Sequence, residues 1–240
     1  MFRFYAELND FLAPERRYRP IVREFIDDAA VKDMIESMGV PHTEVDLILV
    51  NGEPAGFDGI VRDGDYLSVY PVFESFDIEP VSKVRPKPLR VTRFILDTHL
   101  GRLAAYLRMA GFDTLYRNDY TDEELAATSR DEHRILLTRD VGLLKRGAVT
   151  HGYFIRQADP KRQFAEVIAR FDLARSMQPF SLCMRCNASL REISREEAAG
   201  RTPPRVAAEF NEFRSCPVCR RVYWKGGHYE RMSRMLPDGR

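Results

Sequence analysis

The sequence predicts an α/β protein of three segments, and three observations lead to that prediction. Residues 91–174 alternate strand-like with helix-like runs, an order typical of a parallel sheet covered by helices. Residues 1–77 contain short strands around one helix, and residues 175–240 hold the four cysteines of the chain as two CxxC pairs. Between the first two segments, IEPVSKVRPKPLR (78–90) contains three prolines, so we interpret it as a linker.

The first segment follows the order strand, strand, helix, strand, strand. FRFYAEL (2–8) alternates apolar and polar residues, as a half-buried strand does. AVKDMIESM (30–38) places its apolar residues on one helical face, and Gly39 follows as a C-terminal cap. VDLILVNGEP predicts a strand that enters an Asn-Gly turn, and DGDYLSVYPVF predicts the closing strand.

This order, with the stretches VKDMIESMGVPHTEVDLILVNG and DGDYLSVYPVF, resembles the ubiquitin-like β-grasp family. The nearest likeness is to the sulfur carriers of thiamin and molybdopterin synthesis, which act through a C-terminal Gly-Gly tail that is adenylated and thiocarboxylated. Here the matching strand continues through PVFE (71–74) without a Gly-Gly pair, so the carrier chemistry is not expected. We interpret the segment as a docking or regulatory module for a protein partner.

The second segment has clear helix boundaries. VTRFIL, DTLY, RILLT and GYFIR are predicted strands. A helix is expected from Leu100 to Met109 and ends at Gly111. TDEELAATSRDE begins with Thr121 as N-cap and Glu124 completing a capping box, and PKRQFAEVIARF is the final helix.

Acidic residues follow three consecutive strands of this segment. Asp97 directly follows VTRFIL, and Asp140 comes two residues after RILLT. Asp119, Asp122 and Glu123 lie in the loop and first helical turn after DTLY. Because ligands bind outside the carboxyl ends of parallel strands, we expect these acids at one edge of the sheet. Taken singly, each also fits a helix N-terminus or a strand cap.

Clustered carboxylates need a cation. Two of them about 5 Å apart repel by roughly 3 kcal/mol at an effective dielectric constant near 20. Oxygen ligands favour Mg²⁺ or Mn²⁺, and such a site can activate water and stabilise the leaving oxygen of a phosphodiester. Asp113 and Asp131 precede their strands, so we place them at the opposite edge and outside the site.

RFILDTHLGRLAAYLRMAGFDTLY, the TDEEL helix start and RILLTRD together resemble the PIN-like RNase domain of the Mut-seven C-terminal family. The likeness covers about residues 91–240. It implies that Asp97 and Asp140 bind Mg²⁺ or Mn²⁺, with Asp122 as the best candidate from the middle position. Arg102 and Arg139 are candidates for phosphate contacts, and a structural ion pair is the alternative role for each.

The cysteines predict a zinc ribbon over residues 175–240. The pairs Cys183/Cys186 and Cys216/Cys219 are separated by 29 residues. Two such turns supply the four thiolates of a tetrahedral Zn²⁺ site, and with no open ligand position the zinc would be structural. We expect an inserted helix around ISREEAAG between the pairs.

The chain after the second cysteine pair combines positive charge with aromatic rings, which can stack on bases and hold backbone phosphates. The alternative is that Tyr223 and Trp224 pack the small zinc core. The RNA-binding candidates of this stretch are Arg220, Arg221, Trp224, Lys225 and His228, with Tyr223 beside them.

Charge is unevenly distributed along the chain. Residues 1–79 contain 7 Lys and Arg against 17 Asp and Glu, a net charge of −10. Residues 80–174 have a net charge of +5, from 17 against 12, and residues 175–240 have +6, from 13 against 7. An acidic front joined to a basic remainder suggests separate domains and a polyanionic partner for the basic part.

The sequence predicts a cytoplasmic protein without a membrane partner. No apolar run approaches the roughly 18 residues of a membrane span, and MFRFYAELND has acids where a signal peptide is apolar. In a reducing compartment the cysteines favour metal binding over disulfides. We therefore expect a metal-dependent ribonuclease with a zinc ribbon and an acidic ubiquitin-like module. The alternative is a non-catalytic RNA-binding or adaptor protein of the same fold; the oligomeric state and the RNA cleaved stay open.

Overall fold

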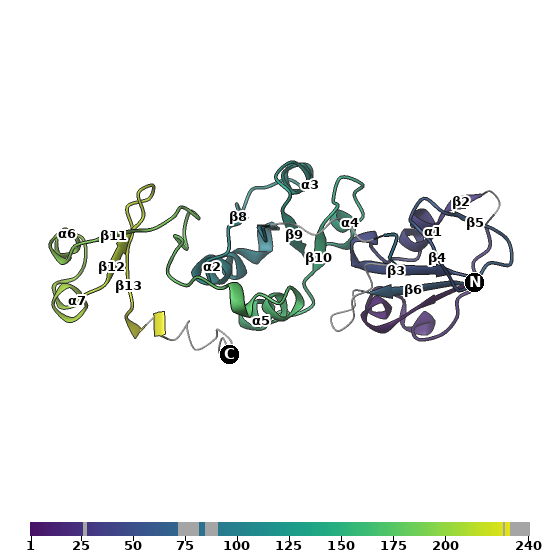
Figure 1. Ribbon diagram of the computed structural model, residues 1–240, viewed down its shortest axis with the longest axis horizontal. Coiled ribbons are helices and arrows are strands. Elements are labelled where there is room, and N and C mark those ends of the chain that lie inside the picture. Colours follow the sequence, from purple (N-terminus) through teal and green to yellow (C-terminus); the bar gives the residue numbers. More distant parts are fainter. Residues whose placement is uncertain (26–27, 72–81, 85–90, 228, 231–240) are drawn as a thin grey trace. The chain divides into compact units, whose positions relative to one another are not determined.

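The computed structural model describes residues 1–25, 28–71, 82–84, 91–227, 229 and 230, and Figure 1 traces the chain. It divides into two compact units. One comprises residues 1–90 with 121–154, and the other residues 91–120 with 155–240. Within the described ranges, no helix is long and apolar enough to cross a membrane.

The first segment contains a four-stranded mixed sheet with the strand order β1-β6-β3-β4. Strands β1 and β6 pair in parallel, whereas β6 with β3 and β3 with β4 pair antiparallel. Two further strands, β2 and β5, form a separate antiparallel pair. The elements are β1 (Phe2–Phe4), η1 (Ala6–Phe11), η2 (Pro14–Arg16), β2 (Ala29–Ala30), α1 (Val31–Ser37), η3 (His42–Glu44), β3 (Val45–Val50), β4 (Glu53–Pro54), β5 (Ile60–Val61) and β6 (Leu67–Pro71).

One apolar core joins helix α1 to this sheet. Val31, Met34 and Ile35 of the helix are buried together with strand residues such as Phe4 and Ile48. Their spacing puts the apolar side chains on one helical face, as the sequence predicts. The Asn-Gly turn after β3 also forms as expected, with φ values of 52° at Asn51 and 90° at Gly52.

The strand predicted over residues 2–8 is only partly correct, because it ends at Phe4. The chain turns into the 3-10 helix η1 around the buried side chain of Asn9. The Asn9 amide donates to the carbonyl oxygens of Phe4 (3.0 Å) and Ala6 (2.9 Å), and its oxygen accepts from Tyr18 N (2.7 Å). The Asn9 side chain thus takes up backbone carbonyl and N–H groups that would otherwise need partners in a neighbouring strand, so the chain can leave the sheet after Phe4.

Part of the predicted linker has structure. Val84 is buried in the core of the first segment, and the hydroxyl of Ser82 donates to Asp46 O. The remaining linker residues, and the closing strand beyond Pro71, lie outside the described residues.

The central segment contains a parallel sheet, as predicted. Strand β7 pairs in parallel with β8, and β9 pairs in parallel with β10. The helix α4, only four residues long, was not predicted. The elements are β7 (Phe94–Leu96), η4 (Thr98–Leu100), α2 (Gly101–Met109), β8 (Thr114–Tyr116), α3 (Asp122–Asp131), β9 (Ile135–Thr138), α4 (Val141–Leu144), β10 (Gly152–Phe154), α5 (Pro160–Arg170) and η5 (Ala174–Ser176).

The helix ends of this segment match their sequence signals. Gly111 follows α2 with φ 95°, and a Cβ there would lie 2.3 Å from Gln178 O, so only glycine fits. Helix α3 starts with the predicted capping box. Thr121 Oγ1 accepts from Glu124 N (3.2 Å), while Thr121 N donates to the Glu124 carboxylate (2.8 Å).

The cysteine-containing segment holds a three-stranded antiparallel sheet with the order β11-β12-β13. Helix α6 lies where ISREEAAG predicts a helix, whereas α7 was not predicted. The elements are β11 (Arg191–Ile193), α6 (Arg195–Ala199), α7 (Pro204–Glu209), β12 (Phe213–Ser215) and β13 (Val222–Trp224).

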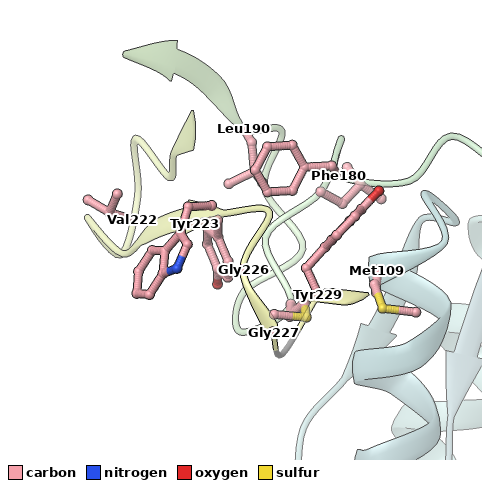
Figure 2. A pocket seen from close by; sticks show the side chains of 11 residues that line it. Met109, Phe180, Leu190, Val222, Tyr223, Gly226, Gly227 and Tyr229 are labelled. Carbon is pink, nitrogen blue, oxygen red and sulfur yellow. The ribbon is translucent and has the colours of Figure 1, made fainter. Parts of the chain in front are cut away.

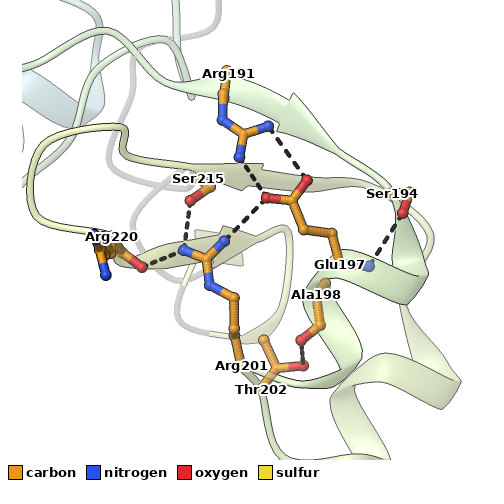
Figure 3. A network of polar contacts seen from close by, with 8 residues as sticks. All are labelled: Arg191, Ser194, Glu197, Ala198, Arg201, Thr202, Ser215 and Arg220. Atoms are coloured by element: carbon orange, nitrogen blue, oxygen red, sulfur yellow. Dashed lines mark hydrogen bonds and ion pairs between the residues drawn. The ribbon is translucent and has the colours of Figure 1, made fainter.

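A polar network attaches α6 to the rest of this segment (Figure 3). The Glu197 carboxylate accepts from both Arg191 and Arg201. Arg201 also donates to Ser215 Oγ (2.7 Å) and to Arg220 O in the second cysteine turn. The inserted helix is therefore linked to the turn that carries two of the cysteines.

Candidate metal centres and nucleic-acid site

The four cysteines predicted to bind zinc come together. All four sulfur atoms lie within 4.8 Å of one another, with 3.5 Å between Cys183 and Cys219 and 3.3 Å between Cys186 and Cys216. Tetrahedral zinc with Zn–S bonds of about 2.3 Å separates its sulfur ligands by about 3.8 Å. This donor set fits one zinc ion and is consistent with a zinc ribbon.

The two cysteine turns share one backbone geometry. In each, the N–H of the first cysteine donates to the carbonyl five residues later, at 2.8 Å in the first turn and 2.9 Å in the second. The residue four positions after the first cysteine is left-handed, Asn187 with φ 67° and Arg220 with φ 59°. The repeated geometry brings the two pairs of thiols to one point.

Without a cation this cluster holds few negative charges. Burial works against ionisation of Cys183, but the Tyr223 hydroxyl 3.1 Å away and backbone amides outweigh it and bring the pKa of the Cys183 thiol down to about 6. Burial and neighbouring thiols raise the pKa of Cys186 to about 12, and burial also raises the pKa of Cys219. A bound metal ion is needed to hold several thiolates together.

The first cysteine turn is attached to helix α2 and strand β8 through Arg108. This guanidinium is buried, with 5% of the residue exposed. Its Nε donates to Thr114 O (2.9 Å), and its Nη1 donates to the carbonyls of Met184 (3.2 Å) and Arg185 (3.0 Å). One side chain therefore joins the CxxC turn to strand β8 of the parallel sheet.

Asn187 makes a second connection at the same place. Its side-chain oxygen accepts from Thr114 N (3.0 Å), and its amide donates to Asp113 Oδ1 (2.6 Å). Asp113, which we excluded from the acidic site, thus contacts the cysteine turn. Sequence reasoning did not predict these roles of Arg108 and Asn187.

Asp97 directly follows β7, as predicted, and caps the 3-10 helix η4. Its Oδ1 accepts from Thr98 N (2.5 Å). Tyr116, at the end of β8, donates its hydroxyl to Thr98 O (2.8 Å). A Cβ at Gly101 would lie 2.7 Å from that hydroxyl oxygen, so glycine at the start of α2 allows the ring to approach the turn.

Asp119 is engaged by its neighbour. Arg117 contacts both carboxylate oxygens at 2.9 Å, and this pairing holds the pKa of Asp119 below its usual range. The Arg117 guanidinium also lies over the ring of Tyr120, 4.8 Å from its centroid. Both side chains of the ion pair are largely exposed.

Arg146, a residue that sequence reasoning missed, forms ion pairs with both Asp122 and Glu123. Arg146 Nη2 lies 3.3 Å from Asp122 Oδ2, and its Nη1 lies 2.9 Å from Glu123 Oε1. Backbone and Arg146 hydrogen bonds hold the pKa of Glu123 below its usual range. The sequence shows that Arg146 is positively charged but gives no local sign that it pairs with acids more than 20 residues away.

Asp140 follows β9 and caps helix α4, so the predicted position is correct. Its Oδ1 accepts from the backbone N–H groups of Gly142 (2.6 Å) and Leu143 (3.3 Å). Among the described residues, one group of three or more potential metal ligands has its ligand atoms close together, and that group is the four cysteines. A metal site shared by Asp97, Asp140 and a middle acid stays a prediction.

The RNA-binding candidates lie mostly at the surface. Arg102, Arg139, Arg220 and Arg221 are exposed. Trp224 packs against the small core formed by Ile193, Ala198 and Phe213. Lys225 forms an ion pair with Glu212. His228 lies outside the described residues.

Two family models match the chain. One, described as the Mut7-C RNAse domain, matches residues 92–236. The chain belongs to the Mut7-C RNase domain family. A second model, described as Mut7-C ubiquitin, matches residues 1–77, the bounds predicted for the ubiquitin-like segment. Neither a curated protein nor a solved structure matches the chain.

The Mut7-C RNase domain also contains a cavity that was not predicted (Figure 2). Its volume is about 370 Å³. Aromatic, aliphatic and methionine side chains surround it, including residues from the end of α2, the first cysteine turn and β13. In the sequence, the feature that pointed to this region was the aromatic pair Tyr223 and Trp224 at the end of β13. The lining residues are Met109, Phe180, Leu182, Met184, Leu190, Val222, Tyr223, Trp224, Gly226, Gly227 and Tyr229.

Proposed function

We propose that this chain is a metal-dependent ribonuclease with a PIN-like active site. Asp97, Asp140 and Asp122 are its ligands for Mg²⁺ or Mn²⁺. The observation that supports this most is the Mut7-C RNase match, which spans a parallel sheet whose strands β7 and β9 are each followed by a helix-capping aspartate. An acid at each such position suits a divalent cation.

For the middle ligand we favour Asp122, with Glu123 beside it, over Asp119. Asp122 lies in the first turn of α3, and Arg146 approaches its carboxylate at one oxygen, Oδ2, 3.3 Å away. Arg117 instead engages both carboxylate oxygens of Asp119 at 2.9 Å within the same loop.

A divalent ion bound by these acids would activate water and stabilise the leaving oxygen of the phosphodiester. The chain contributes rigid ligands. Backbone N–H groups hold the carboxylates of Asp97 and Asp140 at the starts of helical turns, which fixes their orientation before RNA binds. Arg102 and Arg139, which are exposed, are proposed to contact RNA phosphates.

The zinc ribbon has a structural role in this proposal. Four cysteine ligands leave no open position for catalysis. The residues proposed to bind RNA in this part of the chain are Arg220, Arg221, Trp224, Lys225 and His228. The thiols of the cluster suit a reducing compartment such as the cytoplasm.

We assign the acidic ubiquitin-like module to a protein partner. Residues 1–79 carry a net charge of −10, which is unfavourable for contact with RNA and favourable for contact with a basic protein surface.

Cleavage assays on the full-length chain test the proposal. A panel of single-stranded and structured RNAs is incubated with Mg²⁺, with Mn²⁺, and without added divalent ion. Cleavage only with added metal is the expected result. RNA that binds but stays intact under every condition would instead support a non-catalytic RNA-binding or adaptor protein.

A further inference from the structure

We propose that the cavity beside the cysteine cluster binds one unstacked nucleobase of single-stranded RNA. This inference builds on the proposed RNA function and narrows its substrate class. A base in a duplex is stacked and paired, and cannot enter a side pocket without leaving the helix. The chain would therefore select single-stranded RNA.

The size and lining of the cavity fit a flat aromatic ligand. About 370 Å³ is within the range of about 300–1,000 Å³ for small-ligand sites. Phe180 and Tyr229 meet edge to face, with ring centroids 5.5 Å apart and an interplanar angle of 69°. Figure 2 shows the Tyr229 side chain between Phe180 and Met109. Such aromatic and thioether groups are suited to stacking on a base.

Positive charge lies beside the same ring. Arg214 Cζ is 5.1 Å and Lys225 Nζ 5.9 Å from the Phe180 ring centroid. Glu192 pairs with Arg214, which is partly exposed and also donates to Phe180 O, and Glu212 pairs with Lys225. Both carboxylates are largely exposed, and such ion pairs are weak enough to exchange for phosphate. A base in the cavity would place its flanking phosphates within reach of both cations.

An apolar peptide side chain would fit the cavity less well. It would use the apolar walls but would supply no anion to replace Glu192 and Glu212 beside the two cations. A nucleotide uses both features, and residues 175–240 carry a net charge of +6 that attracts a polyanion.

The cavity wall includes part of the cysteine turn. Met184 lies between Cys183 and Cys186, and the Tyr223 hydroxyl contacts Cys183 Sγ at 3.1 Å. At Gly226 a Cβ would lie 2.6 Å from Trp224 Nε1, so glycine leaves room for the indole that lines the cavity. Zinc binding and base binding are therefore coupled through shared residues.

Trp224 provides a direct readout because it is the only tryptophan in the chain. Full-length protein with Asp140→Asn is titrated, without added divalent ion, with single-stranded RNA of about ten nucleotides, a length within the range of single-strand binders. The matching abasic ribose-phosphate oligomer, the duplex and an apolar dipeptide are tested in parallel. Saturable quenching by single-stranded RNA is expected, with the abasic oligomer and the duplex at least about tenfold weaker.

Two substitutions at one position separate base stacking from charge. Tyr229→Ala should weaken binding of single-stranded RNA about tenfold and leave abasic binding unchanged, whereas Tyr229→Phe should stay within about twofold of the parent. The matched control is Tyr18→Ala, which removes an aromatic residue that is 68% exposed in the ubiquitin-like module and should have no effect. Zinc content and circular dichroism verify that each variant is folded.

Equal quenching by the abasic oligomer, equal binding of the duplex, or no effect of Tyr229→Ala would overturn the proposal. Quenching by the dipeptide but not by RNA would overturn it in favour of a protein ligand. Because these titrations need no cleavage, base-dependent quenching combined with a parent chain that cleaves no RNA in the metal assays would reject the ribonuclease proposal alone.

Discussion

At Arg220, one residue combines a backbone role with a surface charge. Its left-handed φ of 59° closes the second cysteine turn, where its N–H donates to Cys216 O (3.0 Å) and its carbonyl accepts from Arg201. A left-handed conformation costs a non-glycine residue roughly 1–2 kcal/mol. The exposed guanidinium is nevertheless in the stretch expected to bind RNA.

Replacing Arg220 with glycine should separate these two roles. We expect Arg220→Gly to leave the free energy of unfolding unchanged or to raise it by up to about 1 kcal/mol, because glycine adopts this φ without strain. RNA affinity should fall severalfold through the lost phosphate contact, as measured by fluorescence anisotropy. The control is Arg221→Ala. Arg221 does not have a left-handed backbone, so this variant removes a neighbouring charge without relieving backbone strain. A large loss of stability in Arg220→Gly, or unchanged RNA affinity, would contradict this account.

At the scale of elements, the first cysteine turn is part of the RNase-like fold. Arg108 of α2 bonds to Thr114 at the start of β8 and to two carbonyls of the turn, and Asn187 adds two more bonds. A buried guanidinium is desolvated, which lowers the pKa of Arg108, while nearby thiols partly counteract this. The three hydrogen bonds compensate for that burial.

Arg108→Lys should therefore lower the free energy of unfolding by about 1–3 kcal/mol, because lysine cannot satisfy three carbonyls in a planar fork. Urea denaturation followed by Trp224 fluorescence measures this change. Arg130→Lys is the matched control: Arg130 is exposed and pairs with Asp131, so a change within about 0.5 kcal/mol is expected. Equal stability of the two variants would show that Arg108 does not hold the cysteine turn.

Long periodic elements could be predicted from the sequence, and short ones could not. Helices α2 and α3 carry a buried stripe or a capping box, which are local signals. The segments η1, α4 and α7 have four to six residues, no more than two helical turns, and so show no usable period. For η1 the decisive residue is Asn9, whose buried amide turns the chain while the alternating pattern favours a strand.

The candidate site shows the same division. The positions of Asp97 and Asp140 after their strands, and the cluster of four cysteines, could be predicted because strand ends and CxxC spacing are local features of the sequence. The metal-binding role of the two aspartates stays a prediction. Arg146 reaches Asp122 across 24 residues, and Arg108 reaches Arg185 across 77, so neither role leaves a local trace.

At the scale of the whole molecule, the ubiquitin-like segment shares a compact unit with β9 and β10. The buried Glu44 accepts from Phe154 N at the end of β10 (2.6 Å). His42 lies between the Glu36 carboxylate (2.6 Å) and Val149 O (2.9 Å). The loop that follows Asp140 and α4 is thereby held by this segment.

Loss of the Glu44 contact should destabilise both parts together. In Glu44→Ala the Phe154 N–H loses this acceptor, and we expect a loss of about 1–3 kcal/mol in the free energy of unfolding. Hydrogen exchange should show faster exchange in β3 and in β10 alike. Glu53→Ala, at an exposed position in β4, serves as the control. If only residues 1–71 exchange faster, the two parts are not coupled.

The central claim, that Asp140 is a catalytic metal ligand, is tested most directly by the rate of RNA cleavage in Asp140→Asn. Asparagine caps a helix nearly as well as aspartate, so the fold is kept while the ligand charge is lost. Asp131→Asn is the control, since Asp131 is exposed, pairs with Arg130 and precedes β9.

With saturating Mg²⁺ or Mn²⁺, Asp140→Asn should lose at least about a hundredfold in cleavage rate, with Asp97→Asn behaving alike, while Asp131→Asn cleaves as fast as the parent chain. Cleavage by Asp140→Asn at the parent rate, in protein shown to be folded, would contradict the account.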